Sequence, residues 1–316
     1  SSRSAAVFIS DYGNSDVCEL NLITFHELQS KYPCILQKRG LMSLEKDGEI
    51  EEFKSHAKSL GLTPISADEA KEKAPIIDLK SVKQAAWRDD VFDIDTDLLI
   101  QKLRQECISN GVQIFTNSGI NSLEINKGRW ILNSKIQSEI LINASGAWAD
   151  NIARLANLKP KNIQPFKRSM ARVEIDTSHN LSPLPVLFGS DDTWYAKPDA
   201  GSMIVSPADA SPCEPHDAWA HEEDIALGIY NFEKMVETKV KKLTSNWAGL
   251  RSFAPDQSLV IGPDADATNF FWLAGQGGYG FQTCLAASQI AEDLLFNQIS
   301  QVPNSISEKF SPNRFT

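Results

Sequence analysis

The glycine-rich segment 275–280 holds the residues best suited to bind a ligand. Gly275, Gly277 and Gly280 have the spacing of the dinucleotide fingerprint, between a predicted strand and a predicted helix. That fingerprint opens a βαβ unit with an acidic residue about 20 positions on, whereas a single helix follows here. We interpret the segment as a turn whose N–H groups and positive helix end face an anionic ring or phosphate. The alternative is a tight turn without a ligand. The three glycines, the pair Gly277-Gly278 and Tyr279 favour the interpretation as a ligand-binding turn.

Segment 143–148, Asn-Ala-Ser-Gly-Ala-Trp, has the same design at the end of a second predicted strand. The small residues Ala144 and Gly146, just before Trp148, let another backbone or a cofactor approach closely. Plain packing of a strand against a helix explains the same residues equally well. Both interpretations stay open for this segment.

Two arginines lie in largely uncharged surroundings: Arg168 in Pro-Phe-Lys-Arg-Ser-Met and Arg251 in Trp-Ala-Gly-Leu-Arg-Ser-Phe. A partly buried guanidinium needs an anion, and two of them could clamp a carboxylate bidentately. The alternatives are an ion pair of Arg251 with Asp256 and a solvated strand end for Arg168.

Other catalytic chemistry has weaker support in the sequence. Cys213, His216 and His221 lie in an acidic loop, but their spacing fits no standard zinc pattern, so we predict a solvated loop and no metal site. No Gly-x-Ser-x-Gly elbow or Ser/His/Asp arrangement is evident, so hydrolysis lacks a nucleophile.

The elements that must position these residues alternate between strand and helix from Asp95 onward, which is typical of an α/β fold. The pattern predicts a helix capped by Asp95 and ended by Gly111, then strands over 112–116 and 139–142. An earlier helix follows the capping residue Asn14. Residues 170–206 are rich in β-strand patterns. The interleaving predicts two lobes, each built from discontinuous segments.

Composition narrows the partners and the compartment. With 316 residues, the chain exceeds the size at which one hydrophobic core stops growing. The 41 acidic and 31 basic residues give a net charge of -10, which disfavours nucleic acid as a partner. The odd number of cysteines without a C-x-x-C predicts a reducing, cytoplasmic compartment. No apolar run reaches the length of about 20 residues that spans a bilayer, while peripheral membrane contact stays open.

Three strings carry a family resemblance: 140–150, 247–253 and 275–283. In order and spacing they resemble the FAD-dependent oxidoreductases of the D-amino acid oxidase and sarcosine oxidase group. Within this group the likeness is greatest to bacterial D-arginine dehydrogenases, which the chain also resembles at 3–6, 93–97, 197–201 and 206–208. The resemblance covers nearly the whole chain and implies FAD as the cofactor.

The resemblance assigns roles residue by residue. In that family two arginines and two tyrosines hold the substrate carboxylate above the flavin, and the matching catalytic residues are Arg168, Arg251, Tyr12 and Tyr195, with Gly278 beside them. The cofactor-binding residues that it implies are Arg3, Ser4, Ala5, Ala6, Ala144, Gly146, Trp148, Gly277, Gly278, Tyr279, Gly280, Gln282 and Thr283.

Two departures from the family concern the substrate side chain. The acidic residue that binds a cationic side chain in relatives falls on Leu41, and a histidine of the pocket falls on Val7. Because an apolar wall desolvates a guanidinium without compensation, we expect a D-amino acid with a neutral or apolar side chain.

A third departure concerns the front of the chain. Family members begin with a strand, a glycine fingerprint and a helix that hold the ADP half of FAD, a unit of about 40 residues that this sequence does not show. We expect the sequence to be an N-terminally incomplete version of the protein. The alternative is a product that does not hold FAD in the usual way.

The predicted fold is therefore α/β with a mixed α+β character, in two interleaved lobes. The FAD-binding α/β domain comprises 1–15, 91–167 and 246–316, and the β-sheet substrate domain comprises 16–90 and 168–245.

The resemblance implies oxidative deamination, in which the α-carbon gives a hydride to flavin N5 and the imino acid hydrolyses in water. The electron acceptor stays open between oxygen and a quinone; the resemblance favours a dehydrogenase. The alternatives are a secondary-amine or 2-hydroxy-acid flavoenzyme of the same fold, and a non-catalytic fragment.

Overall fold

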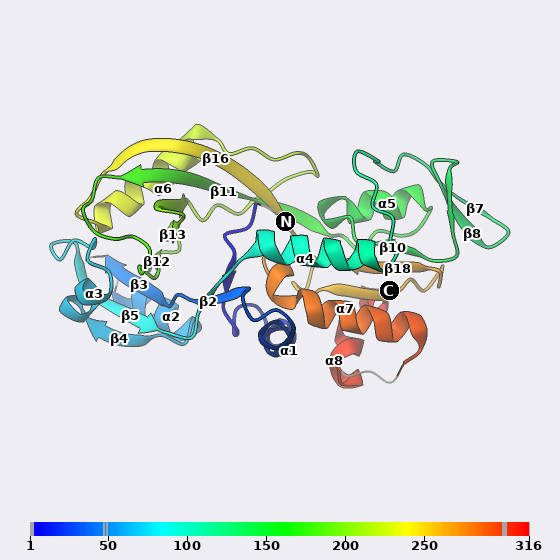
Figure 1. Ribbon diagram of the computed structural model, residues 1–316, viewed down its shortest axis with the longest axis horizontal. Helices are drawn as coiled ribbons and strands as arrows, with labels where there is room; N and C mark the ends of the chain where they lie inside the picture. The colour runs from blue at the N-terminus through cyan, green and yellow to red at the C-terminus, as the bar shows by residue number, and fades with distance from the viewer. Residues whose placement is uncertain (1–2, 47, 49, 299–301, 316) are drawn as a thin grey trace.

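A nine-stranded sheet forms the larger lobe, on the left of Figure 1. The computed structural model describes residues 3–46, 48, 50–298 and 302–315. The strands of this sheet are β3 Leu41–Lys46, β4 Thr63–Ser66, β5 Val82–Arg88, β11 Gln164–Ile175, β12 Val186–Gly189, β13 Tyr195–Asp199, β14 Ser202–Ser206, β15 Ser211–Pro212 and β16 Val240–Phe253. Their order is β15-β11-β14-β13-β12-β3-β5-β4, and β16 pairs with β11.

Three helices belong to this lobe: α2 Ile50–Ser59, α3 Ala67–Lys73 and α6 Glu222–Met235. The core between α6 and the sheet contains Phe232, whose ring lies 5.7 Å from the ring of Trp194 in an edge-on contact. The long strands β11 and β16 extend from this lobe to the middle of the molecule (Figure 1). They therefore connect the sheet with the second lobe.

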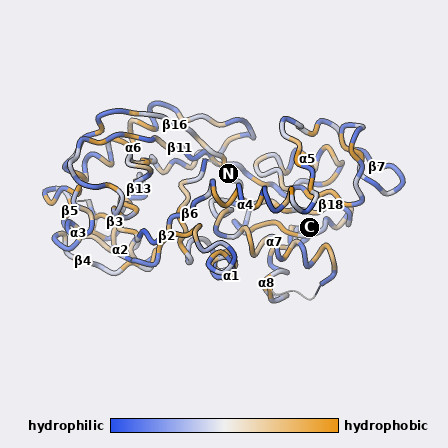
Figure 2. Tube along the Cα trace, in the orientation of Figure 1, coloured by the Kyte–Doolittle hydropathy of each residue, from blue (hydrophilic) through white to orange (hydrophobic). Residues whose placement is uncertain are grey.

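The smaller lobe is built on a three-stranded sheet of β10 Leu141–Asn143, β17 Val260–Pro263 and β18 Phe270–Ala274. β18 is central, parallel to β10 and antiparallel to β17, and its trace is largely hydrophobic (Figure 2). The helices beside this sheet are α1 Ser15–Lys31, α4 Thr96–Ser109, η1 Gly146–Trp148, α5 Ala149–Leu155, α7 Gly280–Phe296, α8 Asn304–Ser307, η2 Glu308–Phe310 and η3 Pro312–Phe315.

Two further small sheets complete the architecture. One joins β1 Val7–Phe8, β6 Phe92–Ile94 and β2 Leu36–Lys38; the other joins β7 Leu123–Asn126, β8 Arg129–Leu132 and β9 Ile136–Ser138. The mixed α/β architecture that the sequence predicts is confirmed. No helix within the described ranges combines the length and the apolar character needed to cross a membrane.

Predicted helix starts are confirmed where a local cap determines them. The Asn14 side chain accepts a hydrogen bond from the Val17 N–H, and the Asp95 side chain accepts one from the Leu98 N–H. Each cap satisfies an N–H group that has no partner inside its helix.

The strand predicted over 112–116 is wrong. These residues are irregular, and Val112, Ile114 and Phe115 are exposed. A strand needs a neighbour for its backbone groups, and no strand among the described residues pairs with this segment. Apolar alternation alone therefore misled the prediction.

The position of α1 also differs from the predicted domain division, which assigned 16–90 to the substrate domain. Val17 and Leu20 of α1 lie in one core with Ile261 and Ile290 of the smaller lobe. The apolar face of α1 packs on α7, whereas residues 41–88 join the large sheet. β11 and β16 likewise continue across the boundaries predicted at 167/168 and 245/246.

Candidate active site

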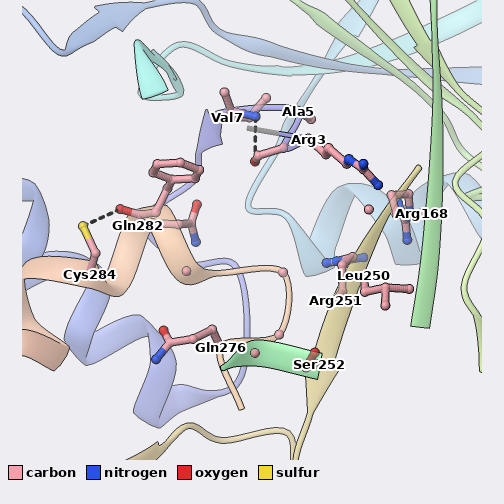
Figure 3. A pocket seen from close by; sticks show the side chains of 18 of the residues that line it. Arg3, Ala5, Val7, Arg168, Leu250, Arg251, Ser252, Gln276, Gln282 and Cys284 are labelled. Atoms are coloured by element: carbon pink, nitrogen blue, oxygen red, sulfur yellow. Dashed lines mark hydrogen bonds between the residues drawn. The ribbon is translucent and has the colours of Figure 1, made fainter. Parts of the chain in front are cut away.

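A cavity of about 1130 Å³ is lined by residues of both lobes (Figure 3). The ends of β11 and β16, the N-terminal segment and the turns after β10 and β18 all contribute to its wall. The predicted site residues that line it are Arg3, Ser4, Ala5, Ala6, Val7, Tyr12, Ala144, Gly146, Trp148, Arg168, Tyr195, Arg251, Gly277, Gly278, Gly280 and Gln282. The structure thus gathers most of the predicted site around one space.

Three predicted residues do not line the cavity. Leu41 is fully buried in β3, in a core with Phe53 and Val186, so it does not form the wall of a substrate pocket. Thr283 is fully buried, and its hydroxyl donates to the Tyr279 carbonyl. Tyr279 contacts the site through Tyr12, whose ring it packs against edge-on at 5.6 Å.

The register of β11 and β16 brings the two arginines to the same face of the sheet. Arg168 lies opposite Gly249, and Arg251 lies two residues farther along β16. Side chains two residues apart on a strand point to the same face. Gly249 puts no side chain between them, and Arg3 lies there: a Cβ on Gly249 would lie 3.2 Å from the Arg3 Cβ and 3.6 Å from the Arg3 carbonyl oxygen. Both guanidinium groups border the cavity (Figure 3).

Arg251 is held by aromatic neighbours. Its Nη2 donates to the Tyr12 hydroxyl at 3.0 Å, and its guanidinium lies 5.5 Å from the Phe253 ring. Burial disfavours its charged form, but the tyrosine hydroxyls around it outweigh burial and raise the pKa of Arg251. The alternative ion pair with Asp256 is wrong, because Asp256 accepts from Arg314 at 2.6 Å. Arg251 therefore holds a positive charge at the cavity wall.

Arg168 is held by a backbone carbonyl and an aromatic ring. Its Nε donates to the Asp209 carbonyl at 2.7 Å, and its guanidinium lies 5.9 Å from the Tyr195 ring. Within the described ranges, neither Arg168 nor Arg251 forms an ion pair with a carboxylate. Two partly buried cations without a counter-ion favour an anionic ligand between them.

The turn after β18 is tied to the strand that carries Arg251. The Gly277 N–H donates to the Ser252 carbonyl at 2.8 Å. A Cβ on Gly278 would lie 1.8 Å from Arg251 Nη2, so a side chain here would force the guanidinium to move. Gly277 has φ +53, and helix α7 begins at Gly280. Because Gly280 and Gln282 line the cavity, the positive end of α7 borders it.

The turn after β10 has a different surrounding. Asn143 shapes it: its amide donates to the Ala149 carbonyl, and its Oδ1 accepts from the Ser145 hydroxyl. Gly146 has φ +60, and a Cβ there would meet nothing within 4 Å. Gly146 lines the cavity, so the space above it is available to a ligand.

Arg3 uses its side chain differently from the prediction. Its Nη1 donates to the carbonyls of Ala218 and Ala248, and its Nη2 pairs with Asp217 at 2.7 Å. The guanidinium thereby attaches the loop that precedes α6 to β16. Any contact of this segment with a cofactor rests on its backbone and on the small residues after Arg3.

The sequence did not indicate one polar cluster at the cavity. His56 Nδ1 lies 2.8 Å from Ser43 Oγ, and His56 Nε2 lies 3.0 Å from Asp192 Oδ1. His56 and Asp192 line the cavity. Ser43 is fully buried, so this Ser/His/Asp arrangement offers no accessible nucleophile. The three residues come from distant segments, and no local sequence signal connects them.

The loop with Cys213, His216 and His221 has no metal-binding geometry. Across the part of the chain that the structure describes, no group of three or more His, Cys, Asp or Glu side chains is arranged to hold a metal ion. The His216 ring instead packs edge-on against Trp219 at 5.4 Å.

Together the fold and the site place Arg168 and Arg251, with the glycine turns after β10 and β18, around one cavity of about 1130 Å³. A family model described as FAD dependent oxidoreductase matches residues 1–294. The chain therefore belongs to this FAD dependent oxidoreductase family, and FAD is its cofactor.

Individual proteins are similar at low identity. FAD-dependent oxidoreductase domain-containing protein 1 of Xenopus laevis is 23% identical over 278 residues, 74% of this chain and 54% of that protein. Glycine oxidase from Geobacillus kaustophilus superposes with a TM-score of 0.80 at 17% identity, over 98% of this chain and 87% of that one. L-proline dehydrogenase from P. horikoshii superposes with a TM-score of 0.78 at 19% identity, over 97% of this chain and 85% of that one. The chain spans about half the length of the curated relatives it matches.

The site residues fit FAD. Gln282 Oε1 accepts from the Ile9 N–H at 3.0 Å, while its buried Nε2 has no partner among the described residues. A buried donor without a partner is costly, and a flavin carbonyl would satisfy it. The open space above Gly146 and the positive end of α7 suit a planar, electron-accepting ring.

Proposed function

We propose that this chain oxidises the α-carbon of a D-amino acid with a neutral side chain, with FAD as the electron acceptor in the site. The observation that carries the proposal is the pair Arg168 and Arg251. They lie on one face of the β11–β16 ladder, in one cavity, without a carboxylate partner in the described ranges. A substrate carboxylate is the anion that such a pair suits best.

The tyrosines complete the carboxylate site that we propose. Tyr12 accepts a hydrogen bond from Arg251, which leaves its own O–H free to donate to the carboxylate. Tyr195 lies under Arg168 and is buried against Phe188. Two cations and two hydroxyl donors would fix the carboxylate and hence the position of the α-carbon. Such orientation is a large part of catalysis between bound groups.

When bound, FAD would supply the two-electron acceptor for the α-hydrogen, which leaves the α-carbon as a hydride that carries the electron pair. The chain contributes orientation and electrostatics. The positive end of α7 favours negative charge that develops beside it, and apolar walls at Ile9, Met170 and Phe188 exclude water from the carbon. The imino acid product then hydrolyses in water.

The comparisons support an amino-acid or amine substrate. The two structural neighbours act, by their names, on glycine and on L-proline. Because proline is a secondary amine, secondary-amine oxidation is the second candidate function. The neutral side chain is supported by Val7, which lines the cavity together with Ile9 and Leu60.

We further propose a dehydrogenase that acts in the cytoplasm. All five cysteines are free, and Cys34 and Cys107 are exposed. Exposed free thiols fit a reducing compartment. Oxygen consumption, measured beside the reduction of a quinone analogue, tests the acceptor; rapid oxygen consumption would identify an oxidase.

The experiment is a panel of D-amino acids, L-amino acids, sarcosine and 2-hydroxy acids with the FAD-loaded protein and an artificial electron acceptor. We expect the highest kcat/KM for D-amino acids with neutral side chains. A preference for D-arginine or D-lysine would contradict the neutral class. Highest activity with sarcosine would select the second candidate, and no activity with any compound would contradict both.

A further inference from the structure

His56 and Asp192 are cavity-lining residues that the proposed reaction does not use. His56 is buried on α2 and is held on both sides, by Ser43 at 2.8 Å and by Asp192 at 3.0 Å. Asp192 follows β12 in the turn that leads to β13, and its side chain is 76% exposed. Among the described residues its Oδ1 pairs with His56, and its Oδ2 is left as an acceptor.

A row of rings leads from the arginine pair to this cluster. The Arg168 guanidinium lies 5.9 Å from the Tyr195 ring, which stacks on Phe188 at 5.3 Å. The Phe188 ring lies 6.1 Å from that of His56. All four residues border the same cavity. A substrate whose carboxylate lies at Arg168 can therefore extend its side chain along an apolar row that ends at a polar pair.

We propose that Asp192 binds the distal end of the substrate side chain and selects for a hydrogen-bond donor there. His56, fixed by Ser43, is the positioning residue that orients the carboxylate. The substrate class is then an amino acid with an apolar stem and a terminal hydroxyl, amide or ring N–H. The inference rests on the proposed function, because the carboxylate site gives the side chain its direction.

The carboxylate of Asp192 favours a hydrogen-bond donor, and not an acceptor, at the end of the substrate side chain. A carboxylate only accepts hydrogen bonds, so a terminal carboxylate or carbonyl would repel it or leave it unpaired. Leu60 and Val7 line the same cavity and lie with Phe188 in one apolar cluster, which suits the stem. Asp192 Oδ2 gives the end of this row of rings one acceptor that has no partner among the described residues.

The test uses matched carboxylates that lack an α-amine and so are not oxidised: pentanoate, 5-hydroxypentanoate and 5-aminopentanoate. Their affinities for the FAD-loaded protein are measured by isothermal titration calorimetry, with the four- and six-carbon homologues to cover stem length. We expect the hydroxyl compound to bind about fivefold more tightly than the alkyl compound at one length. Asp192→Ala should remove this gain. A gain for the amino compound alone would overturn the inference, because the distal site would then select a cation and not a neutral donor.

Glu51→Ala is the matched control. Glu51 is an exposed carboxylate on α2 that does not line the cavity, so this variant changes the charge equally and should keep the gain. Equal affinities for the three compounds at every length, or a gain that Asp192→Ala retains, would overturn the inference. If no carboxylate binds the wild-type protein, the arginine site fails as well, which separates the two outcomes.

His56 is tested by the same titrations. His56→Leu removes the donor that orients Asp192 and should reduce the fivefold gain to about twofold, while His56→Gln, which keeps a donor, should restore it. A purely structural role would lower the affinity for all three compounds together. Such a uniform loss would overturn the positioning role.

Discussion

The turn after β10 and the turn after β18 leave neighbouring parallel strands of one sheet, yet their glycines have different surroundings. Gly278 faces Arg251, and a Cβ there would lie 1.8 Å from the guanidinium. Gly146 faces open cavity, and a Cβ there would meet no protein atom within 4 Å. The first glycine leaves room for the Arg251 guanidinium, whereas the second, which its backbone conformation favours, leaves room for a ligand. A glycine-rich string therefore supports different functional conclusions depending on what lies across from it.

Arg251→Ala should have the largest effect, because Arg251 is the group for which the β18 turn makes room. Loss of charged hydrogen bonds to the carboxylate is expected to lower kcat/KM about 10²- to 10³-fold, mainly through KM. Arg251→Lys keeps the charge without the bidentate geometry and should recover only part of the loss. Steady-state kinetics check this; a KM equal to wild type would contradict the role of Arg251.

Gly278→Ala should come next. The new methyl group must displace the Arg251 guanidinium, since the two cannot occupy the same space. We expect kcat/KM to fall about 10- to 100-fold and stability to fall by about 1–3 kcal/mol.

A double-mutant cycle sharpens this prediction. In the Arg251→Ala background, Gly278→Ala should cost little further activity, because the clash is gone. Fully additive losses would show that Gly278 and Arg251 act independently.

Gly146→Ala should have a smaller and different effect. Because φ is +60, alanine is strained there by about 1–2 kcal/mol, which thermal unfolding measures. The methyl group would enter the cavity, so we expect FAD affinity to fall about tenfold. Binding of pentanoate to the FAD-saturated variant should match wild type. Unchanged FAD affinity would contradict the claim that the space at Gly146 is occupied by the cofactor.

Cys284 reports on the same cavity through its reactivity. Burial raises the pKa of Cys284 to about 11, and its side chain borders the cavity. Only the thiolate is alkylated, so the iodoacetamide rate should rise about tenfold per pH unit from pH 8 to 10. FAD should slow the reaction further by covering the thiol. A rate that levels off below pH 10 would contradict the burial of this thiol.

The sequence predicted what depends on neighbours along the chain. The caps at Asn14 and Asp95 use side chains within three residues of the N–H groups that they satisfy. Both glycine turns were visible because strand, glycines and helix are contiguous. The roles of Arg168 and Arg251 came from the family resemblance.

Features that depend on distant segments were missed or misplaced. Segment 112–116 has a strand pattern but no neighbouring strand among the described residues. Leu41 was aligned to a pocket position, yet the β3–β12 pairing places it in a core. The His56 and Asp192 pair needs α2 and the β12–β13 turn to meet. Such contacts follow from tertiary packing, which a local pattern does not encode.

The most direct test of the central claim is the visible spectrum of the FAD-loaded protein under anaerobic conditions. The account predicts that a D-amino acid with a neutral side chain bleaches the absorbance of oxidised flavin. It also predicts that Arg251→Ala requires at least about a hundredfold more substrate for the same bleaching. A flavin spectrum that no amino acid changes, or equal bleaching of Arg251→Ala and wild type at low substrate concentration, would contradict it.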